Sequence, residues 1–166
     1  MPSKFQTSTC EFLRRPRTSA DQPWIETLLQ ARWGGTKMVV HNEIIDLSML
    51  PAWVMDPQRG LATYRVSPSG AELLSLDAIT PGQGVGSALL DALITALRRD
   101  GVPSLRVTTT NDNIAALRFY QRRGFTLQSL RPGAVNAARA HKPEIPLIGH
   151  NNIPIRDEID LSLTLV

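Results

Sequence analysis

The segment that most constrains the fold of this chain is a loop with glycines at alternate positions, Gly82, Gly84 and Gly86. An apolar run at residues 73–79 precedes the loop and an amphipathic segment at residues 87–99 follows it, which predicts a strand, a tight loop and a helix. The first turn of a helix has backbone N–H groups without partners, and its dipole favours negative charge there. Because glycine lets a ligand approach that backbone closely, the loop is a candidate cradle for a pyrophosphate.

Several kinds of loop fit this glycine pattern, a plain strand-to-helix turn among them. A P-loop would end in Gly-Lys-Ser or Gly-Lys-Thr, and this loop has no lysine. A dinucleotide-binding loop lies near the start of its domain, and the next strand ends in an acidic residue. Here about half of the chain precedes the loop, and the next predicted strand, at residues 105–109, ends in threonines. A remaining kind of phosphate loop is paired with a second motif downstream.

That second motif occupies residues 113–125. Asn113 is a good helix N-cap, and the apolar side chains after it form one helical face. Gly124 is placed to end the helix in the left-handed conformation, and Phe125 begins a new strand. Paired with the glycine loop, the motif resembles the GNAT superfamily of acyl-CoA-dependent N-acetyltransferases. Every specified position of the family's second motif is met, by Asn113, Ala116, Phe119, Tyr120, Gly124 and Phe125.

The family's first motif, Arg/Gln-x-x-Gly-x-Gly/Ala, is met at Gly84 and Gly86 but not at its opening position, where Pro81 stands. Proline offers the phosphates neither a long polar side chain nor an N–H group. We therefore expect either that Gln83 compensates or that the affinity for the cofactor is lower. For the fold, the resemblance implies the α/β (α+β) class, with a GNAT-like mixed, mostly antiparallel sheet flanked by helices.

The resemblance also implies a reaction. We expect an acetyl-CoA-dependent N-acetyltransferase, an acyltransferase that moves an acetyl group by direct attack to a primary amine of an unidentified small molecule or polypeptide. The alternative is a non-catalytic CoA-binding regulatory or sensory module that keeps the fold. A nucleotide-binding module of the dinucleotide type is a third possibility, disfavoured by the second motif.

The family's acetyl-CoA site, carried over position by position, falls on the loop, the strand before it and the second motif. In GNAT folds the pantetheine arm pairs with the strand before the loop, where that strand splays from the next one. A backbone N–H near Leu76 would then polarise the thioester carbonyl. The implied cofactor-binding residues are Leu76, Gly82, Gln83, Gly84, Val85, Gly86, Ser87, Asn113, Ala116 and Tyr120.

Two side chains are implied as catalytic. Tyr120 occupies the family's position for the general acid that protonates the departing thiolate. Glu72 lies four residues before Leu76, so strand periodicity predicts that both point to one face, from which Glu72 accepts the amine proton. Asp77 is predicted to point to the other face unless a bulge redirects it. Further candidates for the base precede the closing strand: Asp157 and Glu158.

Composition and charge limit the other functions. The 166 residues are 42% hydrophobic and 20% charged, so we expect one domain at residues 1–166, with residues 1–10 as a flexible tail. No apolar run is long enough to cross a membrane, and the first ten residues are too polar for a signal peptide. The single cysteine, Cys10, cannot form an internal disulfide, and a cytoplasmic protein is expected.

The net charge of +3 is mild, and the arginines lack the basic run and interleaved aromatic residues of a nucleic-acid-binding protein. The three histidines, His41, His141 and His150, have no metal-ligand spacing, so no metal is expected. We expect a monomer or a homodimer. Most arginines should lie on solvated helix faces, and one or two of the following should meet CoA phosphates: Arg118, Arg122, Arg123 and Arg131.

Hydrophobic periodicity and turn residues predict the remaining elements. Strands are expected at residues 11–14, 38–40, 52–55, 61–66 and 159–166. Helices are expected from a cap at Asp21 to Gly34, and at residues 134–140.

Overall fold

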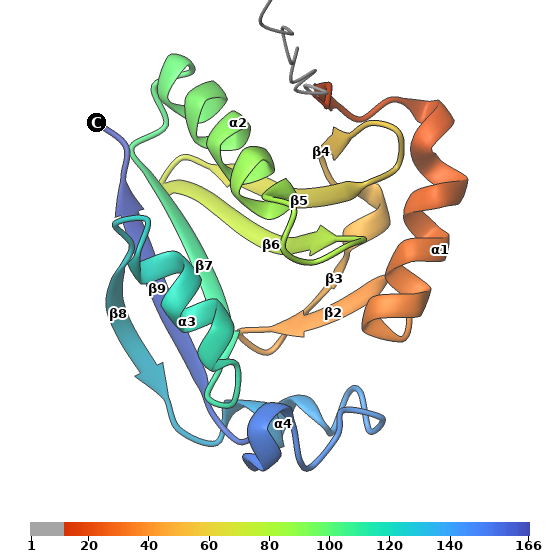
Figure 1. The fold of residues 1–166 in the computed structure, drawn as a ribbon. Coiled ribbons are helices and arrows are strands. Elements are labelled where there is room, and N and C mark those ends of the chain that lie inside the picture. Colours follow the sequence, from red (N-terminus) through yellow and green to blue (C-terminus); the bar gives the residue numbers. More distant parts are fainter. Residues whose placement is uncertain (1–11) are drawn as a thin grey trace, which may run out of the picture.

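A seven-stranded sheet forms the centre of the computed structural model, which describes residues 12–166 (Figure 1). The strand order is β1-β4-β5-β6-β7-β9-β8. The strands are Arg14–Pro16 (β1), Ala52–Met55 (β4), Gly60–Ser67 (β5), Gly70–Ala78 (β6), Ser104–Thr110 (β7), Thr126–Arg131 (β8) and Glu158–Thr164 (β9). β6 and β7 run parallel, and all other neighbours are antiparallel. The predicted mixed, mostly antiparallel sheet is confirmed.

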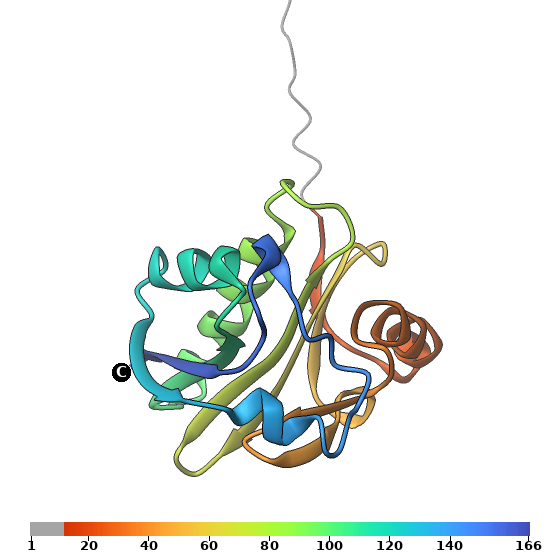
Figure 2. The ribbon, with the colours of Figure 1, turned by 90° about the horizontal axis from the view of Figure 1, so that it is seen from below.

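Helices cover both faces of this sheet. They are Gln22–Trp33 (α1), Val85–Arg99 (α2), Ile114–Gln121 (α3) and Ala134–Ala138 (α4), with short 3-10 turns at Ser19–Asp21, Leu47–Met49 and His150–Asn152. Leucines at four-residue spacing, Leu89, Leu93 and Leu97, bury one side of α2 against the sheet together with residues of α3. A second core lies under α1. Figure 2 shows α1 on the opposite side of the sheet from α2 and α3.

A separate hairpin lies beside the main sheet on the α1 side. It consists of β2 (Lys37–Val40) and β3 (Glu43–Asp46), which pair only with each other. Its turn residues, His41 and Asn42, both have positive φ, as a two-residue hairpin turn requires. The strand predicted at residues 38–40 is present, but it belongs to this hairpin, and β3 was not predicted.

A bulge in β6 changes which side chains share a face. Tyr64 of β5 pairs with Leu73 and Thr63 pairs with Ser75, so Leu74 has no partner of its own. Leu73 consequently packs in the core under α2, whereas Leu74 packs in the core under α1.

The bulge overturns one prediction from strand periodicity. Glu72 precedes the bulge and Leu76 follows it, so the two side chains point to opposite faces and not to the same one. Asp77 lies on the α1 face, where Trp33 Nε1 donates to its carboxylate at 3.1 and 3.2 Å. The bulge that the sequence left open as an alternative is therefore the arrangement found.

β6 and β7 pair over a short length and then separate. Their pairing is limited to Ala71 with Leu105, Glu72 with Arg106 and Leu73 with Val107. Beyond that point β6 continues to Ala78 and β7 to Thr110 without pairing, and Figure 1 shows the two strands diverging. The divergence leaves an opening in the middle of the sheet, which is the split that the resemblance implied.

Element bounds differ from prediction at the chain ends. The first strand is Arg14–Pro16 and not residues 11–14, and the closing strand ends at Thr164. The predicted tail at residues 1–10, which includes Cys10, lies outside the described residues.

Candidate functional site

The glycine loop between β6 and α2 is held open by two residues in the left-handed conformation. Gly82 has φ +79°, and Gly84, the N-cap of α2, has φ +73°. A Cβ at either position would meet nothing within 4 Å, so glycine is required for its backbone conformation and not for packing. Within residues 12–166, the amides of Val85, Gly86 and Ser87 donate no backbone hydrogen bond. The first turn of α2 therefore has N–H groups without a backbone partner.

Two arginines lie beside these amides. Arg59 Nη1 donates to Gln83 Oε1 at 3.2 Å. Arg123 donates to Ser87 Oγ, and its guanidinium lies 3.6 Å from the centre of the Phe119 ring. Arg123 was among the arginines expected near phosphates. Sequence reasoning missed Arg59, because it precedes β5 and comes to the loop only through the turn after β4.

Gly86 connects the loop to the split in the sheet. An atom at its Cβ position would lie 3.8 Å from Leu76 Cδ2 and 3.9 Å from Phe119 Cζ, so β6, α2 and α3 meet here. Leu76 lies beyond the last residue of β6 that pairs with β7. Val85 is buried with its side chain in the core, which leaves only its backbone for a ligand.

The second motif forms α3 as predicted. Asn113 Oδ1 accepts from the amide of Ala116 at 3.1 Å, which is the expected N-cap. Gly124 has φ +87° and ends the helical segment before β8. Ala116 packs at the margin of the core under α2 and α3.

Tyr120 is buried between two aromatic rings. Its ring centre lies 5.1 Å from that of Phe119 and 5.3 Å from that of Phe125, both in edge-to-face arrangements. Burial raises the pKa of the phenol well above its usual value, the negative charge of Asp77 adds to this, and Arg123 opposes it. The hydroxyl is therefore protonated at neutral pH, as a proton donor must be.

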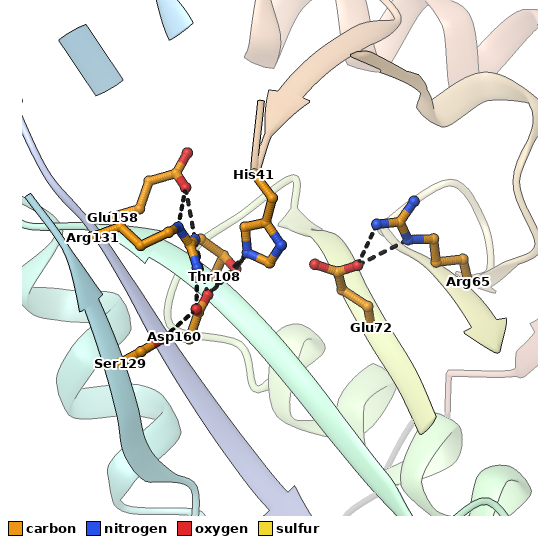
Figure 3. Close-up of polar contacts among 8 residues, drawn as sticks. All are labelled: His41, Arg65, Glu72, Thr108, Ser129, Arg131, Glu158 and Asp160. Atoms are coloured by element: carbon orange, nitrogen blue, oxygen red, sulfur yellow. Dashed lines mark hydrogen bonds and ion pairs between the residues drawn. The ribbon is translucent and has the colours of Figure 1, made fainter. Parts of the chain in front are cut away.

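Glu72 has one oxygen occupied and one without a partner. Arg65 Nε and Nη2 both donate to Oε2 at 2.8 Å, across the β5–β6 pair. The other oxygen, Oε1, is buried and accepts no hydrogen bond within residues 12–166. A buried acceptor without a donor is costly, so a water molecule or a ligand N–H is expected beside it. In Figure 3 this oxygen points toward His41.

A network of polar side chains links the hairpin to the far side of the split (Figure 3). Asp160 on β9 accepts from Thr108 Oγ1 at 2.6 Å and from Ser129 Oγ at 2.6 Å. Its carboxylate also contacts His41 Nε2 at 3.1 Å and Arg131 Nη2 at 3.0 Å. Burial by itself would raise the pKa of Asp160, but these hydrogen bonds outweigh it and hold the pKa well below its usual range.

A cavity of about 570 Å³ opens where β6 and β7 separate. Leu74 and Thr108, the residues just past the last β6–β7 pair, form its inner end, and Glu158 lies in its wall. The hairpin, the end of α1 and residues 135–146 form the other walls. The lining includes Asn113 but neither Glu72 nor Asp157; Asp157 Oδ1 instead accepts from the amide of Gly133 at 2.8 Å.

No helix in residues 12–166 is long and apolar enough to cross a membrane. The same residues contain no group of three or more His, Cys, Asp or Glu side chains arranged to hold a metal ion.

Known proteins resemble this chain in sequence and in fold. Residues 80–125 match the model of the Acetyltransferase (GNAT) family. The uncharacterized protein YxbD of Bacillus subtilis (strain 168) is 39% identical over 148 residues, which cover 87% of this chain and 93% of YxbD.

Solved structures agree with the fold. A Bacillus subtilis acetyltransferase in complex with CoA superposes with a TM-score of 0.68 at 17% identity, over 94% of this chain and all (100%) of that one. A GNAT family acetyltransferase from Elizabethkingia anophelis with acetyl-CoA bound gives 0.63 at 17% identity, over 92% of this chain and 97% of that one.

Proposed function

This chain belongs to the GNAT family of acetyltransferases, and we propose that it moves an acetyl group from acetyl-CoA to a primary amine by direct attack. The observation that carries the proposal is the row of free amides at the start of α2, next to a sheet that splits beside a buried tyrosine. Together these features supply an anion site, a slot for an extended arm and a proton donor.

The pyrophosphate of acetyl-CoA is proposed to bind the amides of residues 82–87. Free N–H groups and the positive end of the α2 dipole favour a negative charge at this position. Arg59 and Arg123 add two positive charges at the edge of the loop. They make up for Pro81, which has no N–H group to offer.

The pantetheine arm is proposed to enter the split along β6, as an added strand would. Support comes from the stretch of β6 from Leu74 to Ala78, which pairs with β5 but not with β7 and leads from the cavity to the glycine loop. A backbone N–H near Leu76 then polarises the thioester carbonyl and stabilises the negative charge on its oxygen. Asn113, the N-cap of α3, lines the cavity from which this passage begins.

Tyr120 is proposed as the general acid. The amine nitrogen forms a bond to the carbonyl carbon, the carbon–sulfur bond breaks, and the phenol gives its proton to the departing thiolate. The raised pKa makes the phenol a weak acid, yet a thiolate in the same dry site is a correspondingly stronger base. Glu72 is proposed to accept the amine proton through a water molecule that occupies the place beside Oε1.

Thiol release is the experiment that tests this function. Acetyl-CoA is incubated with the protein and a panel of amines that includes polyamines, amino acids, aminoglycosides and peptide N-termini. Amine-dependent release of CoA, with acetylated product found by mass spectrometry, is the expected result. Calorimetric binding of acetyl-CoA without release under any amine would instead favour the non-catalytic CoA-binding module.

Glu72→Gln tests the base. The rate should fall most at low pH, where the amine arrives protonated, and should recover as the pH rises toward the amine's own pKa of about 10. A variant with an unchanged pH profile would remove Glu72 from the reaction. Glu43→Gln is the control, because Glu43 is an exposed carboxylate that accepts from the same Arg65.

A further inference from the structure

The cavity at the split has mainly apolar walls. Its uncharged polar lining consists of three threonines and Asn113, and its charged side chains are Arg32, Lys142, Glu144 and Glu158. The apolar walls come from the end of α1, from β2, from β6 and from residues 135–146: Trp33, Met38, Val40, Leu74, Val135 and Ile145. A volume of about 570 Å³ is within the range of pockets that hold small organic ligands. Such walls suit a hydrocarbon body better than a polyamine or a sugar.

Glu158 lines this cavity, and one of its two carboxylate oxygens has no hydrogen-bond partner in residues 12–166. The residue is 5% exposed, and both hydrogen bonds that it accepts, from Nε and Nη2 of Arg131, go to Oε2. Oε1 accepts none within residues 12–166, and Figure 3 shows it pointing away from Arg131. The wall therefore offers a fixed anionic acceptor.

The charged cluster around Glu158 favours a cation. The guanidinium of Arg131 is shared between two carboxylates, Glu158 and Asp160, so the cluster has one more negative than positive charge when His41 is neutral. The lining also includes two basic side chains, Lys142 and Arg32, which donate to backbone carbonyls, and a further carboxylate, Glu144, which offsets part of their charge. Lys142 Nζ donates to the carbonyls of Trp33 and Lys37, and Arg32 donates to those of Ala78 and Ile79, at the end of β6.

We propose that this cavity is the acceptor site and takes a primary amine carried on an apolar body, an arylalkylamine or an alkylamine, with its ammonium group on Glu158 Oε1. The inference rests on the proposed acetyl transfer and names the substrate class for it. The ammonium loses two protons in the full reaction: one leaves through Glu72 to solvent, and the other replaces the proton that Tyr120 gives to the thiolate. Glu158 acts by binding and orienting the amine.

Binding can be followed without turnover, because Trp33 lines the cavity. Phenethylamine, its neutral analogue phenethyl alcohol and putrescine are titrated against the intrinsic fluorescence, in the presence of CoA. Phenethylamine should bind more tightly than both other compounds. Trp33→Phe should remove the change in fluorescence that binding causes. Glu158→Gln should weaken phenethylamine binding about ten- to hundred-fold. The matched control is Asp91→Asn, an exposed carboxylate on α2, which should bind as the wild type does.

The outcomes distinguish a failure of this inference from a failure of the proposed acetyl transfer. Tighter binding of putrescine than of phenethylamine, or a Glu158→Gln variant that binds phenethylamine like the wild type, would overturn the inference even if thiol is released. Phenethylamine bound through Glu158 without thiol release would overturn the acetyl transfer and leave the binding site. Should Glu158→Gln not fold, Ile145→Lys puts a cation on the apolar wall, and unchanged phenethylamine binding would be equally decisive against the proposal.

Discussion

The two ends of the split between β6 and β7 are built in different ways. At the cofactor end, one continuous segment from β6 through the glycine loop into α2 supplies the free amides and the left-handed glycines. At the acceptor end, the cavity is closed by contacts between distant parts of the chain. Lys142 reaches the carbonyl of Trp33 across 109 residues, and His41 meets Asp160 across 119. Residues close in the sequence form the cofactor end, whereas tertiary contacts between distant segments form the acceptor end.

This difference has a functional consequence. An anion site made from helix amides needs only glycines at fixed spacing, so it tolerates change elsewhere in the chain. A cavity assembled from a hairpin, a helix end and a long connection changes whenever one of these segments shifts. If the proposed function holds, specificity for the amine should be set at the acceptor end, and the two ends should respond independently to mutation.

The largest expected effect of a substitution is at Tyr120, the proposed general acid between the cofactor end and the acceptor end. Tyr120→Phe keeps the edge-to-face packing on Phe119 and Phe125 and removes only the hydroxyl. kcat should fall by about 10²–10⁴-fold, with acetyl-CoA affinity nearly unchanged. The control is Tyr64→Phe, at the half-buried tyrosine of β5. An unchanged kcat, in an assay where chemistry limits turnover, would remove Tyr120 from the mechanism.

The second prediction concerns the cofactor end alone. Acetyl-CoA at about 100 times Kd should stabilise the wild type by about 2.7 kcal/mol, and Gly84→Val should lose this stabilisation. Gly101→Val is a matched control at the other end of α2, because Gly101 has φ +71° and also has no atom within 4 Å of a Cβ. Both variants should lose about 1–2 kcal/mol of unfolding free energy from backbone strain. Equal loss of acetyl-CoA binding in both would show that the loop has no special role.

The features at the cofactor end could be predicted from the sequence because residues close together in the chain form them. The free amides, the N-cap of α3 and the succession of strand, loop and helix follow from glycine, asparagine and apolar spacing within about 60 residues. Glu72 was assigned to the wrong face because the bulge at Leu74 depends on pairing with β5, which a single strand's periodicity does not reveal. β3 was missed because the hairpin turn, His41-Asn42, has no glycine to signal it in the sequence. The Arg131–Glu158 pair was missed because its partners are 27 residues apart.

The third prediction tests the acceptor end. Lys142→Met removes two hydrogen bonds that join residues 135–146 to the carbonyls of Trp33 and Lys37. KM for the amine should rise by up to about tenfold, since the cavity wall loses its anchor, while acetyl-CoA affinity stays the same. Lys37→Met is the control, at an exposed lysine on the hairpin. A parallel loss of acetyl-CoA affinity would mean that the two ends are coupled.

The smallest expected effect returns to the cofactor end. Arg59 is held beside the loop by a hydrogen bond at 3.2 Å to Gln83 and by its position 3.9 Å from the ring centre of Phe12. Because this contact is exposed, Arg59→Gln should weaken acetyl-CoA binding only about two- to fivefold. The ratio of the two Kd values, measured by calorimetry, should shrink as salt is raised, since an attraction between exposed charges is screened.

Arg14→Gln, at an exposed arginine of β1, controls for the change in net charge. If Arg14→Gln weakens binding as much as Arg59→Gln does, the protein attracts CoA through its overall charge, and the arginine beside the loop makes no direct contact with a phosphate. If only Arg59→Gln weakens binding, the contact is direct. In that case a side chain from outside the glycine motif compensates for Pro81, so even the local end of the site depends on one distant residue.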